Sequence, residues 1–102
     1  MDQQKIYSLN EIKNKISPVA KKNGVERVYL FGSYARGEAT TESDLDFRID
    51  KGKLRTLFEL GGLYMDLQEE FNKELDLVTT ESLDEDFLNE IKGEEILIYE
   101  NR

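Results

Sequence analysis

Three aspartates, Asp44, Asp46 and Asp76, are the residues of this 102-residue chain whose type and placement best suit chemistry. Asp44 and Asp46 stand two positions apart in "SDLDFRID", where apolar and polar residues alternate as they do along a strand with one solvated face. Side chains two positions apart leave the same face of a strand, so both carboxylates could bind the same hard divalent cations. Without a cation, the two charges would raise each other's pKa or destabilise the fold. For an Asp-x-Asp pair alone, a solvated strand face is the commoner explanation.

Asp76 stands in another predicted strand, "ELDLVT". There Leu75 and Leu77 are expected to face the core while Asp76 faces the other way. Asp76 could therefore complete a site of three carboxylates with Asp44 and Asp46.

A Gly-Ser pair, Gly32 and Ser33, follows the hydrophobic run "VYLF" directly. Glycine lets a backbone turn and approach a ligand closely. We expect Ser33 to cap a one-turn helix, "SYARG", whose free N–H groups bind phosphate, and Gly37 to end that turn. A lone Gly-Ser pair is more often an ordinary tight turn. The combination of this turn with the aspartates favours chemistry on a phosphate.

Two other motifs are excluded by their residues. "GSYARGE" has the glycine spacing of a P-loop, but Glu38 occupies the place of the essential lysine. "DLDFRID" begins like a calcium-binding loop, but Arg48 occupies a ligand position and Ile49 replaces the required glycine.

The amino-acid composition of the chain excludes further classes of function. The 14 Lys and Arg residues against 22 Asp and Glu residues give a net charge of −8, which repels a nucleic-acid backbone and suits a basic protein partner. Taken alone, such a charge more often serves only to keep a protein in solution. The chain has no cysteine and no histidine, so it has no thiol chemistry and lacks the commonest general base. We expect no membrane span, no signal peptide in the polar N-terminal segment, and a cytoplasmic location.

Hydrophobic periodicity predicts one domain over residues 1–102, in which a small mixed β-sheet is flanked by helices, an α/β (α+β) fold. The helices are expected near 8–24, 53–74 and 82–93, and the strands near 25–31, 45–50, 75–80 and 95–100. Ser8 and Glu11 form a capping-box pattern, Pro18 is expected to kink or divide the first helix, and Gly24 to cap its end. Ser82 is the expected N-cap of the last helix.

The long central helix is expected to bury one stripe of residues: Leu57, Leu60, Tyr64, Leu67 and Phe71. Gly61 and Gly62 lie in its interior and cost helix stability, on the order of 1 kcal/mol each. They indicate either close packing or a break in the helix.

"GSYARGEATTESDLDFRID" resembles the signature of the DNA polymerase beta-type nucleotidyltransferases, and is most similar to their smallest members, the minimal nucleotidyltransferase (MNT) proteins. The matching segments are Gly32-Ser33, Ala35-Arg36-Gly37 and Ser43-Asp44-Leu45-Asp46. The resemblance implies a fold like the palm of polymerase beta. It also implies the role of an antitoxin that transfers AMP from ATP to a tyrosine of a HEPN ribonuclease toxin.

The resemblance assigns roles to individual residues. Asp44, Asp46 and Asp76 would be the catalytic residues and hold Mg²⁺, two ions in all, with Asp76 also accepting a proton from the attacking hydroxyl. Gly32, Ser33, Arg36 and Ser43 would bind the nucleotide, although Arg36 could instead pair with an acid and brace its loop. Arg48 departs from the pattern, and could pair with Asp50, bind phosphate or weaken metal affinity.

Two other functions stay open at this point. The chain could neutralise a toxin by binding alone, with any nucleotide merely structural. It could also modify a small molecule such as an aminoglycoside, but few residues remain for a domain that would recognise such an acceptor.

Overall fold

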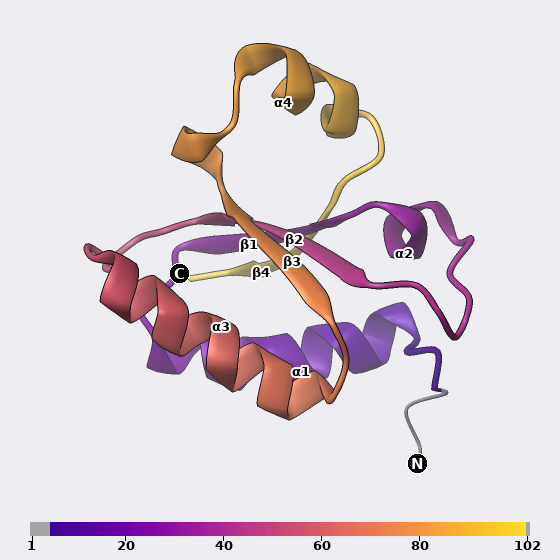
Figure 1. The fold of residues 1–102 in the computed structure, drawn as a ribbon, viewed down its shortest axis with the longest axis horizontal. Coiled ribbons are helices and arrows are strands. Elements are labelled where there is room, and N and C mark those ends of the chain that lie inside the picture. Colours follow the sequence, from indigo (N-terminus) through magenta and orange to yellow (C-terminus); the bar gives the residue numbers. More distant parts are fainter. Residues whose placement is uncertain (1–4, 102) are drawn as a thin grey trace.

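The computed structural model describes residues 5–101. Residue 102 lies outside it, and so do residues 1–4, the first part of the polar N-terminal segment in which no signal peptide is expected. Four α-helices, four strands and one short 3-10 helix make up the described part of the chain (Figure 1). In chain order they are α1 (Leu9–Lys22), β1 (Arg27–Phe31), α2 (Ser33–Arg36), β2 (Leu45–Asp50), α3 (Leu57–Phe71), β3 (Leu75–Thr79), η1 (Thr80–Ser82), α4 (Glu85–Lys92) and β4 (Ile96–Glu100).

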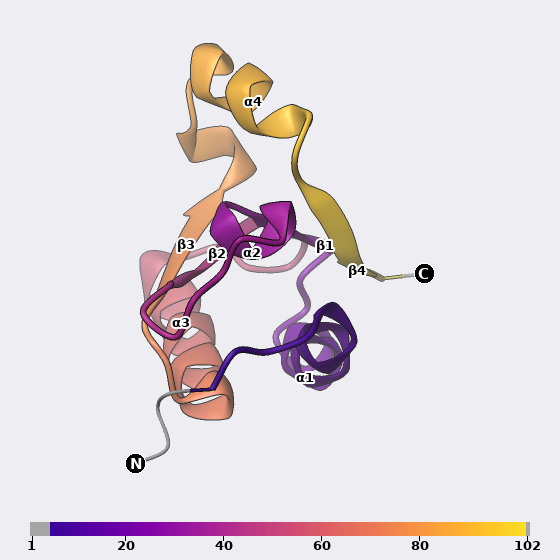
Figure 2. The same cartoon turned by 90° about the vertical axis from the view of Figure 1, so that its right-hand side faces the viewer.

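The four strands form one mixed sheet in the order β3-β2-β1-β4. β1 runs antiparallel to both β2 and β4, and β2 runs parallel to β3 after the α3 crossover. Helices α1 and α3 lie side by side against one face of the sheet, while α4 stands off beyond the opposite face (Figures 1 and 2). The predicted mixed sheet flanked by helices is therefore confirmed.

The core lies between the sheet and the two helices α1 and α3. Alternate residues of β2 are fully buried there, as the strand pattern predicts. The largest fully buried side chains are those of Phe47, Phe71, Ile12, Ile16, Leu30, Leu45, Ile49, Leu63, Leu67, Val25 and Val28. Among residues 5–101, none of the helices combines the length and hydropathy that crossing a bilayer requires.

Helix α1 begins and ends as its sequence predicts. The Ser8 hydroxyl accepts the Glu11 N–H at 3.1 Å, and the Glu11 carboxylate accepts the Ser8 N–H at 2.8 Å, which confirms the capping box. At the other end Gly24 adopts a left-handed conformation, with φ of +71°, directly after the C-cap residue. Its N–H and that of Val25 bond back to carbonyls of the last helical turn, as in a Schellman motif.

The expected interruption of α1 at Pro18 is wrong, because the helix continues through it to Lys22. Proline removes the N–H that would bond to the Asn14 carbonyl. Both residues lie on the exposed side of the helix, where water can solvate that carbonyl.

The predicted stripe of α3 is wrong at its first residue. Leu57 is 85% exposed, whereas Leu63, Leu67 and Phe71 are buried. The capping box formed by Thr56 and Glu59 begins the helix one turn before it reaches the core, so its first apolar residues are in solvent.

The predicted N-cap of α4 is also wrong. Ser82 belongs to η1 and donates its hydroxyl to the Thr79 carbonyl, while Asp84 accepts the Phe87 N–H at 2.9 Å and caps the helix.

Arg48 lies on the face of the sheet opposite the core and is nevertheless buried. Its guanidinium donates two hydrogen bonds to Glu95, at 2.7 and 3.0 Å, and one to the Thr80 hydroxyl at 2.6 Å. It also stacks 4.0 Å from the centre of the Tyr29 ring. The expected pairing with Asp50 is present at 3.7 Å, but Glu95 is the main partner. The donors of Arg48 are thus used within the fold, and this arrangement is structural.

We expect Arg48→Met to lower the free energy of unfolding by about 3–5 kcal/mol, because it leaves the Glu95 carboxylate buried without its counter-ion. Both side chains are only 8% exposed. The double variant Arg48→Met, Glu95→Met should recover most of that loss, since no buried charge remains. Urea denaturation of the three variants and the parent measures this coupling. Additive losses in the double variant would contradict a coupled pair.

Candidate active site

The parallel pairing of β2 with β3 places Asp46 directly opposite Asp76. The core residues on either side of each aspartate fix this register, so both carboxylates leave the face away from the core. Asp46 is half-buried and Asp76 is exposed. The structure thus confirms the orientation that was expected of Asp76, with Leu75 buried beside it.

The two carboxyl groups interact strongly. Burial, then a hydrogen bond with Asp76 and the charge of Asp76, and then the charge of Asp44, raise the pKa of Asp46 from 3.8 to about 7. The positive charge of Arg36 opposes this shift. A carboxyl group that titrates near neutral pH beside a second carboxyl group is typical of a site that binds a cation or moves a proton.

The Gly32 turn packs against the same carboxylate. Gly32 has φ of +78° and ψ of −158°, a conformation that favours glycine. A Cβ atom at this position would collide with the Asp46 carboxylate. The predicted turn and the predicted acid, separated along the chain by a loop, therefore lie in contact.

Helix α2 differs from the expectation at its first residue. Gly32 is the N-cap and makes no side-chain capping bond, while Ser33 is the first helical residue and not its cap. The Ser33 hydroxyl makes no hydrogen bond within residues 5–101, which leaves it able to bind a ligand. Gly37 ends the turn in a left-handed conformation, with φ of +76°, as predicted.

A carboxylate already occupies the anion-binding groups of this turn. Glu94, in the turn after α4, accepts the Gly32 N–H at 2.9 Å and pairs with Arg36 at 3.1 Å. The Gly32 N–H, followed by the Arg36 guanidinium, lowers the pKa of Glu94 below its ordinary value. Sequence reasoning missed Glu94, because it stands 62 positions from Gly32 and no motif marks it.

The other predicted nucleotide ligands have partners of their own. Arg36 donates to Glu38 at 3.1 Å as well as to Glu94. In this structure it therefore braces its own loop, which is the second of the two roles expected for it. The Ser43 hydroxyl accepts the Thr40 N–H at 2.8 Å and thereby closes the loop before β2.

Asp44 is one residue outside β2 and is exposed. Its charge acts on Asp46, which places it near the pair.

The acids suit Mg²⁺ by their chemistry, because this ion prefers oxygen ligands and carboxylates. A cation between Asp46 and Asp76 would also relieve the repulsion that raises the Asp46 pKa. Within residues 5–101, however, no group of three or more acidic side chains is arranged to hold a metal ion. The pair of acids fits a metal, and Asp44 would have to move towards the pair to become a third ligand.

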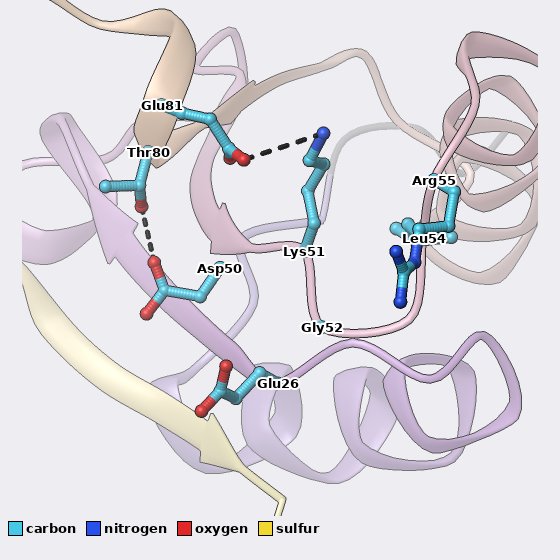
Figure 3. Close-up of a pocket in the computed structure, with 8 residues that line it drawn as sticks. All are labelled: Glu26, Asp50, Lys51, Gly52, Leu54, Arg55, Thr80 and Glu81. Atoms are coloured by element: carbon cyan, nitrogen blue, oxygen red, sulfur yellow. Dashed lines mark hydrogen bonds and ion pairs between the residues drawn. The ribbon is translucent and has the colours of Figure 1, made fainter.

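A prominent hollow of the described structure lies elsewhere (Figure 3). Its volume is about 620 Å³, and it lies at the far end of β2 from Asp46. Four of its polar side chains already bind one another: Thr80 donates to Asp50 at 2.6 Å, and Lys51 pairs with Glu81 at 3.6 Å. We therefore assign the chemistry to the acids and the Gly32 turn, and not to this hollow.

Asp46 should make the metal-free protein less stable as the pH rises from about 4 to about 7. The folded state keeps the Asp46 proton up to a pKa of about 7, whereas the unfolded state releases it near 3.8, so deprotonation favours unfolding in this window. Asp46→Asn should remove this contribution and raise the melting temperature at pH 8. Thermal unfolding in EDTA across this pH range measures it, with Asp86→Asn on exposed α4 as the matched control. Parallel curves for the parent and Asp46→Asn would contradict the raised pKa.

Comparison with known proteins supports the resemblance of the sequence motif to that of the DNA polymerase beta-type nucleotidyltransferases. The family model described as "Polymerase beta, Nucleotidyltransferase" matches residues 14–102. A provisionally named protein adenylyltransferase of Methanocaldococcus jannaschii is 42% identical over 76 residues, which cover 74% of this chain and 82% of that protein.

Two solved structures share the fold. A crystal structure of a toxin–antitoxin with AMP-PNP superposes with a TM-score of 0.74 at 22% identity, covering 88% of this chain and 74% of the other. A complex of a tri-AMPylated Shewanella oneidensis HEPN toxin with an MNT antitoxin gives a TM-score of 0.70 at 19% identity, covering 91% and 73%. Because the family model spans most of its length and the fold agrees, this chain belongs to the polymerase beta nucleotidyltransferase family.

Proposed function

We propose that this protein transfers AMP from ATP to a tyrosine hydroxyl of a partner HEPN-type ribonuclease toxin, and so acts as an antitoxin. The observation that carries the proposal is the contact between the Gly32 turn and Asp46, with Asp76 paired beside it. A turn with phosphate-binding groups next to paired acids suits the transfer of a nucleotide from its triphosphate.

In this reaction the tyrosine oxygen attacks the α-phosphorus of ATP, and the bond between the α-phosphorus and the bridging oxygen to the β-phosphate breaks. Pyrophosphate leaves, and the AMP remains as a phosphodiester on the tyrosine. Asp76 is the more exposed of the paired acids and takes the hydroxyl proton. The chemistry depends on positioning and charge neutralisation, which explains how it proceeds without histidine.

Each group of this chain has a defined task in the proposal. The Gly32 N–H and the Ser33 hydroxyl bind phosphate oxygens, and Arg36 contributes positive charge once it is released from Glu94. Asp46 and Asp76, joined by Asp44, would hold Mg²⁺. When bound, Mg²⁺ would neutralise phosphate charge and favour the ionised form of the attacking hydroxyl.

A protein acceptor fits this chain better than a nucleic acid or a small molecule. Its net charge of −8 suits a basic partner such as a ribonuclease, which must itself attract a phosphate backbone. The similar M. jannaschii protein is named an adenylyltransferase of proteins, and an MNT antitoxin of the same fold is found with an AMPylated HEPN toxin. A reaction that consumes ATP and disables a ribonuclease belongs in the cytoplasm.

Incubation with labelled ATP, Mg²⁺ and the HEPN protein encoded beside it tests the proposal. The parent and Asp86→Asn should label the partner, whereas Asp46→Asn and Asp76→Asn should each lower the rate at least 100-fold, because they remove metal-binding charge. Mass spectrometry should find the added AMP on tyrosine. Equal labelling by Asp46→Asn would overturn the catalytic assignment.

The same variants separate catalysis from neutralisation by binding alone. If Asp46→Asn still protects cells from the toxin as well as the parent does, then complex formation is sufficient. Loss of protection in that variant, with the complex still formed in pull-down, supports AMP transfer as the cause.

Glu94 should compete with the phosphates of ATP for the Gly32 N–H and Arg36. We expect Glu94→Gln to bind a non-hydrolysable ATP analogue roughly fivefold more tightly, because the neutral amide loses its charge-assisted bonds. Glu38→Gln is the matched control, since Glu38 pairs with Arg36 but does not touch Gly32. Titration calorimetry measures both variants. Unchanged or weaker binding in Glu94→Gln would mean that phosphate does not occupy this position.

A further inference from the structure

One face of α3 exposes apolar side chains that have no partner in the described chain. Leu57, Phe58 and Met65 are 85%, 91% and 67% exposed, respectively. At 3.6 residues per turn, Leu57, Gly61 and Met65 form one row along this face, and Phe58 and Gly62 form the next. We call these five residues the α3 face. It lies opposite the side of α3 that packs into the core.

The two glycines make the centre of the α3 face flat. Both are exposed, and a Cβ atom added to either would meet nothing within 4 Å. Glycine weakens a helix interior, and neither position needs a glycine for the fold of the single chain. Small residues at the centre of a helix face allow another helix to approach closely, as they do in packed helix pairs.

Opposite charges stand at the two ends of this face. Arg55 lies just before the helix and Glu69 lies near its end, and both are exposed. Neither side chain forms an ion pair with another residue of the described chain. Beside the cationic end is a hollow of about 560 Å³, next to Phe58 and Gly62, with three lysines in its wall. These are Lys21, Lys22 and Lys53.

We propose that the α3 face binds a second copy of this chain, with the two α3 helices antiparallel about a two-fold axis between Gly61 and Gly62. Phe58 stands three residues before Gly61, and Met65 three residues after Gly62. The axis therefore sets Phe58 of each copy against Met65 of the other, while the glycines pair at the centre. Such an interface is self-complementary, as a two-fold dimer requires.

The same axis brings the unpaired charges together. Arg55 lies six residues before Gly61 and Glu69 lies seven residues after Gly62, so Glu69 of the other copy stands one residue beyond the position directly opposite Arg55, within reach of its long side chain. The lysine-lined hollow of one copy likewise receives the acidic end of the other helix. This local complementarity favours the antiparallel arrangement, because it offsets part of the repulsion between two chains that each carry a net charge of −8.

The dimer leaves the candidate active site open. Helix α3 packs against the core face of the sheet (Figures 1 and 2), whereas Asp46 and Asp76 leave the opposite face. The proposal is therefore independent of the proposed AMP transfer.

Analytical ultracentrifugation of the purified full chain at physiological salt tests the proposal. We expect a concentration-dependent dimer, and Phe58→Asp should weaken it at least tenfold. Leu97→Asp, which changes an exposed apolar residue of β4, is the matched control and should leave it unchanged. A protein that stays monomeric up to about 1 mM overturns the proposal. If that monomer binds a partner protein through Phe58, the face belongs to that partner and the proposal also fails.

Two further variants exclude misfolding and test the orientation. Replacing Gly61 and Gly62 by Gln should raise the melting temperature, since glutamine favours helix more than glycine does, and yet abolish the dimer. Arg55→Glu and Glu69→Arg should each weaken the dimer, and the two together should restore it. Failure of the combined variant to restore the dimer overturns the antiparallel arrangement.

Discussion

The repulsion between two carboxyl groups held side by side is the interaction on which this site depends. Asp46 and Asp76 are opposite one another because the apolar residues around them pair in register within the core. A slip of one residue in that pairing would turn Asp76 towards the core and Leu75 or Leu77 towards solvent. The energy that keeps like charges together is therefore supplied by hydrophobic burial on the opposite face of the same strands. A cation or a proton then relieves the repulsion locally.

The contact of Gly32 with Asp46 follows from the antiparallel pairing of β1 with β2. Phe31, the last residue of β1, pairs with Asp46, so the next residue must turn directly over the carboxylate. Any side chain there would collide with Asp46, and the positive φ excludes most residues other than glycine. One backbone turn thus presents its donor groups beside the acids without any additional structure.

Short sequence patterns correctly predicted those structural features that depend on interactions between residues close together in the chain. The capping box of α1, the glycine that follows its C-cap residue and the burial of alternate residues of β2 each depend on neighbours within a few residues, and each is confirmed. The start of α4 could not be decided in this way, because Ser82 and Asp84 are both good capping residues and the path of η1 selects the second. The exposure of Leu57 was also unpredictable, since periodicity gives the buried side of a helix but not where the core ends.

The residues of the site were predicted from one contiguous motif and from Asp76 in a later strand, but the contacts between distant segments were not specified by the sequence. Gly32, Ser33, Asp44 and Asp46 belong to one stretch, whereas the pairing of Asp46 with Asp76 depends on strand order, which a crossover of one helix makes plausible but does not specify. The contact of Glu94 with the Gly32 turn could not be predicted at all, because Glu94 lies in a distant loop that contains no recognisable motif.

The anchoring of α4 determines how easily Glu94 can leave the turn. Among its described residues only Ile91 is buried, and Phe87 packs edge-on against Phe31 with ring centres 6.1 Å apart. The helix stands away from the sheet in both views (Figures 1 and 2). An element with so little buried surface opens at a lower free energy than the core does. The carboxylate of Glu94 can therefore exchange with a phosphate while the strands that pair Asp46 with Asp76 stay in register.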